Sequence, residues 1–133
     1  MKKVKRFGVS LEEDLLGKLD GLAKKHKFPN RSQTIRFLIR NTLVEDALQH
    51  NKEVAGCLVL IFDHHKRELV NKSLDIQHSF SNLILSTQHV HLDHHNCLEM
   101  IALKGKANQL NELADRLVSL KGIKHGKLTM TAA

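Results

Sequence analysis

Two histidines and a cysteine stand close together in one stretch of this sequence, with a spacing suited to metal binding. His89 and His91 are separated by one residue, and Cys97 follows a few residues later. In a β-strand, residues i and i+2 point to the same face. Two imidazoles on one face, joined by a thiolate from the adjoining strand, favour a divalent ion such as Ni²⁺, Zn²⁺, Co²⁺ or Cu²⁺. The spacing leaves the choice among these metals open.

The cysteine can meet the two histidines only in one class of strand register. In an antiparallel pair, residues opposite each other share a face of the sheet. Because His89, His91 and Cys97 all have odd numbers, they share a face only if the numbers of opposite residues add up to an even value. A two-residue turn at His94-His95 would put the cysteine on the wrong face. We therefore predict an odd-length loop or a bulge between Leu92 and Leu98, for example with Glu99 opposite His91.

Histidine is enriched in this part of the chain. The protein has 10 His, and five of them fall within the 20 residues that end at Cys97. His94-His95 in the turn could add a weak second site, but polar residues are expected in turns and solvation is the favoured interpretation. We expect His64-His65, at the start of a helix, to be exposed as well, and His125 to be structural or on the surface.

The second half of the chain has the pattern of an α+β domain. Apolar alternation and helical stripes predict the order strand, helix, strand, strand, helix, strand. This is the ferredoxin-like βαββαβ pattern, with both helices on one face of one sheet and the other face free for a partner. The predicted strands are 54–62, 83–92, 96–104 and 123–130, and the predicted helices are about 64–81 and 106–121.

The first half predicts a smaller unit of strand, helix and helix. Residues 5–11 alternate as a short strand, and Ser10 is a good N-cap for the helix that follows. The second helix begins near Asn30 or Ser32, either of which can cap it. A unit this small buries too little surface to fold well alone, and its strand lacks a partner. Two copies that pair their strands and interlock their helices would remove both problems.

Composition limits the class of protein. The net charge is +7, with 12 Lys and Arg against 7 Asp and Glu in residues 1–53 and 9 against 7 in residues 54–133. A basic N-terminal arm can meet phosphates, although charge alone fits a solvated terminus equally well. The longest apolar run, Val54–Phe62, is too short to span a membrane. We expect a cytoplasmic protein without a membrane partner, with Cys57 as a buried, inert thiol.

The segment His89-Val-His91-Leu-Asp-His-His-Asn-Cys97-Leu-Glu99 closely resembles the core of the nickel-responsive regulator family, NikR. The resemblance also includes Gln77-His78, Leu103-Lys-Gly105, the front end Arg31-Ser32-x-x-Ile35-Arg36 and the tail Lys121-Gly-Ile-Lys-His125-Gly126. It covers essentially the whole chain in order. It implies a ribbon-helix-helix (βαα) DNA-binding domain at residues 1–50, followed by a ferredoxin-like nickel-binding and tetramerisation domain at residues 51–133.

The same resemblance implies one Ni²⁺ per subunit of a homotetramer, a dimer of dimers. The implied ligands are His89, His91 and Cys97 of one subunit and His78 of another. Gln77 and Glu99 match family positions whose hydrogen bonds orient the ligands. The implied partner is double-stranded operator DNA, contacted by Arg6, Gly8, Ser10, Asn30, Arg31, Ser32, Lys66 and Arg67.

We therefore expect a nickel-dependent, DNA-binding transcription regulator, a repressor of nickel-uptake genes. The alternative is a regulator of the same fold that senses another transition metal or a small molecule. An enzyme with Cys97 as nucleophile is disfavoured because nothing in the sequence indicates an oxyanion hole or a substrate cleft. A metal chaperone is disfavoured because storage has no need of a basic strand-helix-helix unit.

Overall fold

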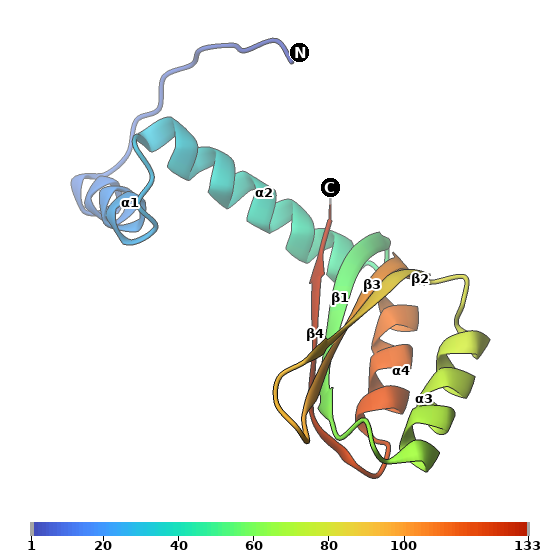
Figure 1. Ribbon diagram of the computed structural model, residues 1–133. Coiled ribbons are helices and arrows are strands. Elements are labelled where there is room, and N and C mark those ends of the chain that lie inside the picture. The colour runs from blue at the N-terminus through green and yellow to red at the C-terminus, as the bar shows by residue number, and fades with distance from the viewer. Residues whose placement is uncertain (1, 133) are drawn as a thin grey trace. The chain divides into compact units, whose positions relative to one another are not determined.

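The computed structural model describes residues 2–132, so Met1 and Ala133, the outer ends of the two expected domains, lie outside the described residues. Contacts divide the chain into two compact units, one up to Thr42 and one from Leu43 onward. None of the described helices is long and apolar enough to cross a membrane. In chain order the elements are α1 (Glu13–Lys25), α2 (Arg31–Gln49), β1 (Glu53–Phe62), α3 (Arg67–Ser79), β2 (Ile84–His91), β3 (Cys97–Lys106), α4 (Ala107–Val118) and β4 (Ile123–Thr131) (Figure 1).

The second unit is one antiparallel sheet with two helices on one face. The strand order is β2-β3-β1-β4, and α3 and α4 lie side by side against the same face (Figure 1). The predicted ferredoxin-like α+β fold is therefore confirmed. α3 begins at Arg67 instead of near residue 64, because Asp63 organises a turn there. Its side chain accepts the His65 N–H, and its carbonyl accepts the Lys66 N–H.

The core of this unit is aliphatic and lies between the sheet and the helices. Burial alternates along β1 and β3, so that every second side chain faces the helices. α4 presents the apolar stripe predicted for it. Each fully buried leucine stabilises the folded state by about 1.5–3 kcal/mol relative to an exposed one. The largest fully buried apolar side chains are Leu58, Leu60, Ile101, Leu103, Leu110, Leu113 and Leu117.

Cys57 departs from expectation. It lies on β1 but on the face that points away from the helices, and it is only half-buried. The prediction of a buried thiol was wrong because a long apolar run does not distinguish the two faces of a strand, whereas the helices cover only one of them.

The first unit begins with an extended segment and no strand. Residues 2–12 carry neither helix nor strand, so the predicted strand 5–11 does not form in the single chain. A strand needs the hydrogen bonds of a neighbouring strand, and none of the strands β1 to β4 pairs with this segment. Ser10 is not the N-cap of α1, since that position is Glu12, which makes no side-chain capping bond. For α2, Asn30 is the cap, because its Oδ1 accepts the Gln33 N–H at 2.9 Å.

The first unit has almost no interior of its own. Thr34 is the one buried residue among residues 2–42. Apolar side chains instead line an open groove between the N-terminal segment and the two helices, and Phe7 is 75% exposed there. The groove is lined by Phe7, Val9, Leu11, Leu15, Leu19, Leu22, Ile35 and Leu38, with the stem of Lys18.

Candidate metal centre and DNA-binding surface

The β2–β3 hairpin brings the predicted metal ligands onto one face. His91 lies directly opposite Cys97, and His89 lies opposite Glu99. Both pairs of numbers add up to an even value, and the loop between the strands, Leu92–Asn96, has five residues. The odd-length loop is therefore confirmed. The example register with Glu99 opposite His91 was wrong by two residues.

Asp93 holds this loop in shape. Its Oδ1 accepts the backbone N–H groups of His95 and Asn96, both at 2.8 Å, and the Asn96 side chain donates to its Oδ2 at 2.9 Å. These bonds, the Asn96 side chain first among them, keep the pKa of Asp93 below its usual value. A carboxylate that accepts several N–H bonds fixes the turn, and the turn fixes the register that places the ligands.

Cys97 and His89 stand at a distance that suits a shared metal ion. The Cys97 Sγ is 3.8 Å from the His89 Nδ1. Ligand atoms at about 2.0 Å for nitrogen and 2.3 Å for sulfur from one ion are separated by roughly 3–4.4 Å. Burial, and secondarily the Glu99 carboxylate, raise the pKa of the Cys97 thiol. A metal that binds here must displace this proton.

Glu99 lies behind the pair as a buried carboxylate. It is 2% exposed, and its Oε1 accepts a hydrogen bond from the Gln77 Nε2 at 2.9 Å. The same Gln77 nitrogen lies 3.0 Å from the Ser73 hydroxyl, to which it also donates. The second carboxylate oxygen is 3.7 Å from the His89 Nε2. Gln77 and Glu99, the two residues expected to orient the ligands, therefore connect α3 to the β2–β3 hairpin.

His91 makes a contact that the sequence did not indicate. Its ring stacks on the His64 ring, with centroids 4.4 Å apart and planes 13° apart. The His64 Nδ1 is buried without a hydrogen-bond partner among the described residues. Burial, then the neighbouring His65 and His91, lower the pKa of His64. The expectation of an exposed His64 was wrong, because the sheet brings the end of β2, which carries His91, beside the loop that follows β1.

The remaining predicted ligand, His78, does not form a cluster with the other predicted ligands among the described residues of the single chain. It is exposed and lies next to the last residue of α3. The ligand strand β2 is an edge strand of the sheet, and the His89 side chain is 51% exposed. The site is thus open on the side where another subunit could approach.

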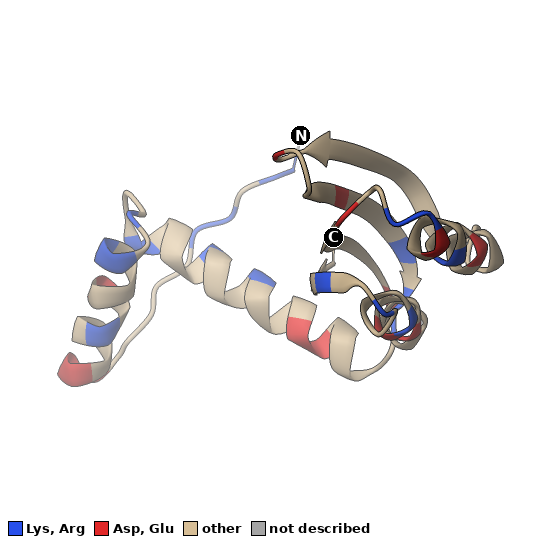
Figure 2. Ribbon diagram, turned by 60° about the horizontal axis from the view of Figure 1, so that its bottom comes forward, with Lys and Arg blue, Asp and Glu red and all other residues tan. Residues whose placement is uncertain are grey.

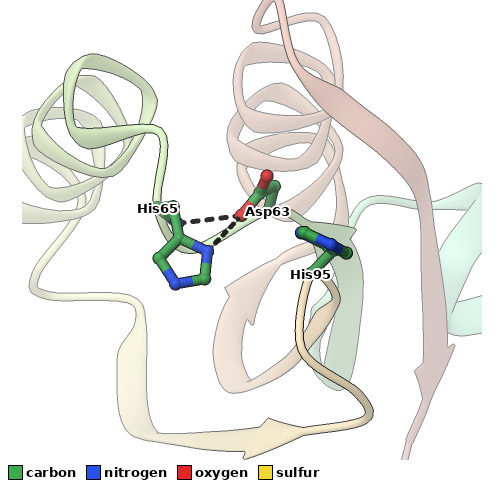
Figure 3. A group of neighbouring side chains, drawn as sticks. All are labelled: Asp63, His65 and His95. Carbon is green, nitrogen blue, oxygen red and sulfur yellow. Dashed lines mark hydrogen bonds and ion pairs between the residues drawn. The ribbon is translucent and has the colours of Figure 1, made fainter.

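A different cluster does have three potential ligands within reach of one ion. Ligand atoms of Asp63, His65 and His95 lie within 4.8 Å of one another (Figure 3). It is the one such cluster in residues 2–132, so His89, His91 and Cys97 do not all meet that distance.

The residues expected to contact DNA in the first unit are on its surface. Arg6, Gly8 and Ser10 are exposed in the extended segment, and Figure 2 shows Lys and Arg along this segment and on both helices. Arg31 already has a partner, since its guanidinium forms two bonds of 2.9 and 3.0 Å with Asp20 of α1. The Arg31 hydrogen bond lowers the pKa of Asp20. Asn30 caps α2, and Ser32 is exposed at its first turn.

Lys66 and Arg67 lie at the start of α3, as the N-cap and the first helical residue. They line a surface pocket in which two further lysines, Lys72 and Lys121, are also found. Glu68 is the one carboxylate in its lining and pairs with Lys72 at 3.0 Å. The excess of positive charge beside a helix N-terminus suits a phosphate.

Comparison with known proteins supplies a family for both parts of the chain. Residues 55–131 match the family described as the NikR C terminal nickel binding domain. Residues 5–49 match the family of ribbon-helix-helix proteins, copG family.

Relatives extend this similarity over nearly the whole chain. A protein of Nitratidesulfovibrio vulgaris strain DP4 is 48% identical over 132 residues, which cover 98% of this chain and 95% of the relative. One of Pyrococcus furiosus is 48% identical over 127 residues, covering 95% of this chain and 92% of that protein. Both are named as nickel-responsive regulators. An uncharacterized protein of Thermotoga maritima, 15% identical, has a similar fold over 59% of this chain and 98% of its own length, with a TM-score of 0.54.

Proposed function

Since this chain belongs to the nickel-responsive regulator (NikR) family, we propose that it is a transcription regulator that binds DNA in response to Ni²⁺. The nickel-binding family covers the ferredoxin-like part, and the ribbon-helix-helix family covers the basic front end. This is a family of regulators, not of enzymes. We place the division between the DNA-binding and nickel-binding domains at residues 1–50 and 51–133. Because it acts on DNA, we place its action in the cytoplasm.

The proposed nickel site is supported best by one observation, the 3.8 Å approach of the Cys97 Sγ to the His89 Nδ1. Glu99 faces the other ring nitrogen of His89. With its proton directed at this carboxylate, His89 keeps the Nδ1 lone pair free for the metal. A thiolate and imidazoles are the donors that Ni²⁺ accepts well. We propose one Ni²⁺ per subunit.

Two further ligands complete the proposed site. His91, opposite Cys97 in the ladder, reaches it by a rotation of its side chain away from His64. His78 is supplied by a neighbouring subunit at the open edge of β2. When bound, the ion supplies a bond between two chains, so metal binding favours the assembled state. The protein's own residues place and orient the donor atoms.

We propose that DNA is bound by dimers of the first unit. A unit with one buried residue and an apolar groove needs a second copy to cover that groove. Pairing of the two extended segments would form a β-ribbon that can enter the major groove and present Arg6, Gly8 and Ser10. Two such dimers on a central tetramer would give a metal-dependent repressor, with nickel-uptake genes as the proposed targets.

The test is DNA binding by the full chain to the region upstream of its own gene, with and without Ni²⁺. We expect tight, sequence-specific DNA binding only with Ni²⁺. We expect the Cys97→Ala variant to lose this Ni²⁺-induced DNA binding. Cys57→Ala is the matched control, because that thiol lies on the other face of the sheet. Equal binding with and without metal would contradict the proposal.

The donor set also suits Zn²⁺, Co²⁺ and Cu²⁺, so a sensor of another metal is the second candidate. Competition titrations that follow the thiolate-to-metal absorption band distinguish the two. The same experiment without metal, with small molecules added instead, tests a ligand at the interface between regulatory domains.

A further inference from the structure

Two loops that are far apart in the sequence leave the sheet at the same place. Phe62, the last residue of β1, lies directly opposite Cys97, the first residue of β3. The residues after Phe62 and the residues before Cys97 are therefore neighbours in space. The first loop carries Asp63 and His65, and the second carries His95.

These three side chains converge. Their ligand atoms lie within 4.8 Å of one another, and Figure 3 shows Asp63 between the two histidines. The His65 Nδ1 is 3.0 Å from the Asp63 Oδ1. Ligand atoms that share one ion at about 2.0–2.2 Å are separated by up to about 4.4 Å, so a small rotation of the two exposed histidine side chains would close the group around a metal.

Both loops are held in place before any metal is bound. Asp63 accepts the backbone N–H of His65 at 2.9 Å, which fixes the first loop. Asp93 accepts the backbone N–H of His95 at 2.8 Å, which fixes the second. Donor groups that are already positioned lose less conformational entropy when they bind.

We propose that Asp63, His65 and His95 form a second binding site for a divalent transition metal. The site is separate from the hairpin ligands His89 and Cys97 and does not depend on the proposed nickel-sensing function. Two imidazoles and one carboxylate suit Ni²⁺, Zn²⁺, Co²⁺ or Cu²⁺. The side chains of His65 and Asp63 are 54% and 21% exposed, so water fills the remaining coordination positions. Without a thiolate, this site binds more weakly than the hairpin site.

The location gives this site a route to the rest of the protein. His65 follows His64, whose ring stacks on His91, and it precedes Lys66 and Arg67 at the start of α3. A metal bound here ties the loop that carries His64 to the loop that carries His95. Occupancy of this site at higher metal concentration thus stiffens the surroundings of His91. It also adds positive charge beside the side chains of Lys66 and Arg67.

The experiment counts Ni²⁺ bound to the full chain by equilibrium dialysis with metal analysis. The wild type should bind two equivalents per chain, the second more weakly. The double variant His65→Gln/His95→Gln should lose the second equivalent and keep the absorption band of the Cys97 site. In a Cys97→Ala background the band disappears, and the equivalent that depends on His65 and His95 should remain.

His50→Gln is the matched control. His50 pairs with Asp46 at 3.0 Å, as His65 does with Asp63, but no second imidazole completes a cluster there among the described residues. The control should keep both equivalents. An unchanged metal count in the double variant, or an equal loss in His50→Gln, overturns the proposal. If the double variant does not fold, Asp63→Asn applies the same criterion with a side chain of equal size.

Discussion

Glu99 is the residue on which the geometry of the proposed nickel site most depends. A carboxylate that is 2% exposed is costly to bury unless it is hydrogen-bonded. Here Gln77 donates to one oxygen, and the His89 ring faces the other. The His89 Nε2 lies 3.7 Å from the Glu99 Oε2 and the Nδ1 lies 3.8 Å from the Cys97 Sγ, so we propose that the Nδ1 is the nitrogen that binds the metal.

Glu99→Gln should weaken Ni²⁺ binding by roughly 10–100-fold, the usual cost of losing a group that orients a ligand. An amide in this position can donate to the His89 Nε2, and this favours the tautomer with its proton on the nitrogen that faces Cys97. Titration against a competing chelator measures the effect. Glu112→Gln, an exposed change on α4, is the control. Equal affinities in the two variants would show that Glu99 does not orient His89.

At the scale of elements, α4 and β4 approach each other closely at Gly126. A Cβ built on Gly126 would lie 2.5 Å from the Val118 Cγ2 and 2.9 Å from the Leu60 Cδ2. This is closer than atoms in a packed core allow, so the absence of a side chain lets the helix lie against the strand.

Gly126→Ala should destabilise the protein by about 1–3 kcal/mol, the usual cost of overpacking. Chemical denaturation measures the loss. In a Val118→Ala background the nearest contact is gone, and the same change should cost less. A penalty that is the same in both backgrounds would mean that Val118 is not the obstacle.

The N-terminal segment is an element whose structure depends on a partner. Arg6→Ala should weaken binding to the operator by about 1–3 kcal/mol if Arg6 contacts a guanine. Lys66→Ala should instead weaken binding to all sequences and reduce the salt dependence, because it would contact a phosphate. Binding isotherms on specific and scrambled DNA at several salt concentrations separate the two effects. An Arg6→Ala protein that kept its preference for the operator would rule out this segment as the reader.

At the scale of the whole molecule, two features of the single chain favour assembly with further copies. The first unit exposes its apolar groove, and the proposed nickel site lacks its fourth ligand on an open sheet edge. Folding of the first unit, metal binding and assembly should therefore be thermodynamically linked.

Mixing two inactive variants tests the shared site. His78→Ala and Cys97→Ala should each fail to form the complete Ni²⁺ site. After subunit exchange, some interfaces combine an intact His78 with an intact Cys97 and should regain the thiolate-to-metal absorption band. If His78 acts within its own chain, or not at all, mixing restores nothing.

Local sequence patterns determined much of this protein. The period of two along the strands and the leucine stripe of residues 110–117 predicted the ferredoxin-like order, because each pattern reflects the geometry of a single element. The parity of strand pairing predicted an odd-length loop, since opposite residues must share a face. The resemblance to NikR was carried by one continuous segment, His89 to Glu99, and by short segments on either side.

Only the tertiary structure decided which separate segments meet. The stacking of His64 on His91, and the cluster of Asp63, His65 and His95, exist because Phe62 pairs with Cys97 at one end of the two central strands, β1 and β3. The sequence around Phe62 contains no pattern that predicts contact with the sequence around Cys97, and the reverse is also true. Cys57 is half-buried because the helices cover only one face of its strand. The strand expected at residues 5–11 is absent because no strand among the described residues supplies hydrogen-bond partners for it.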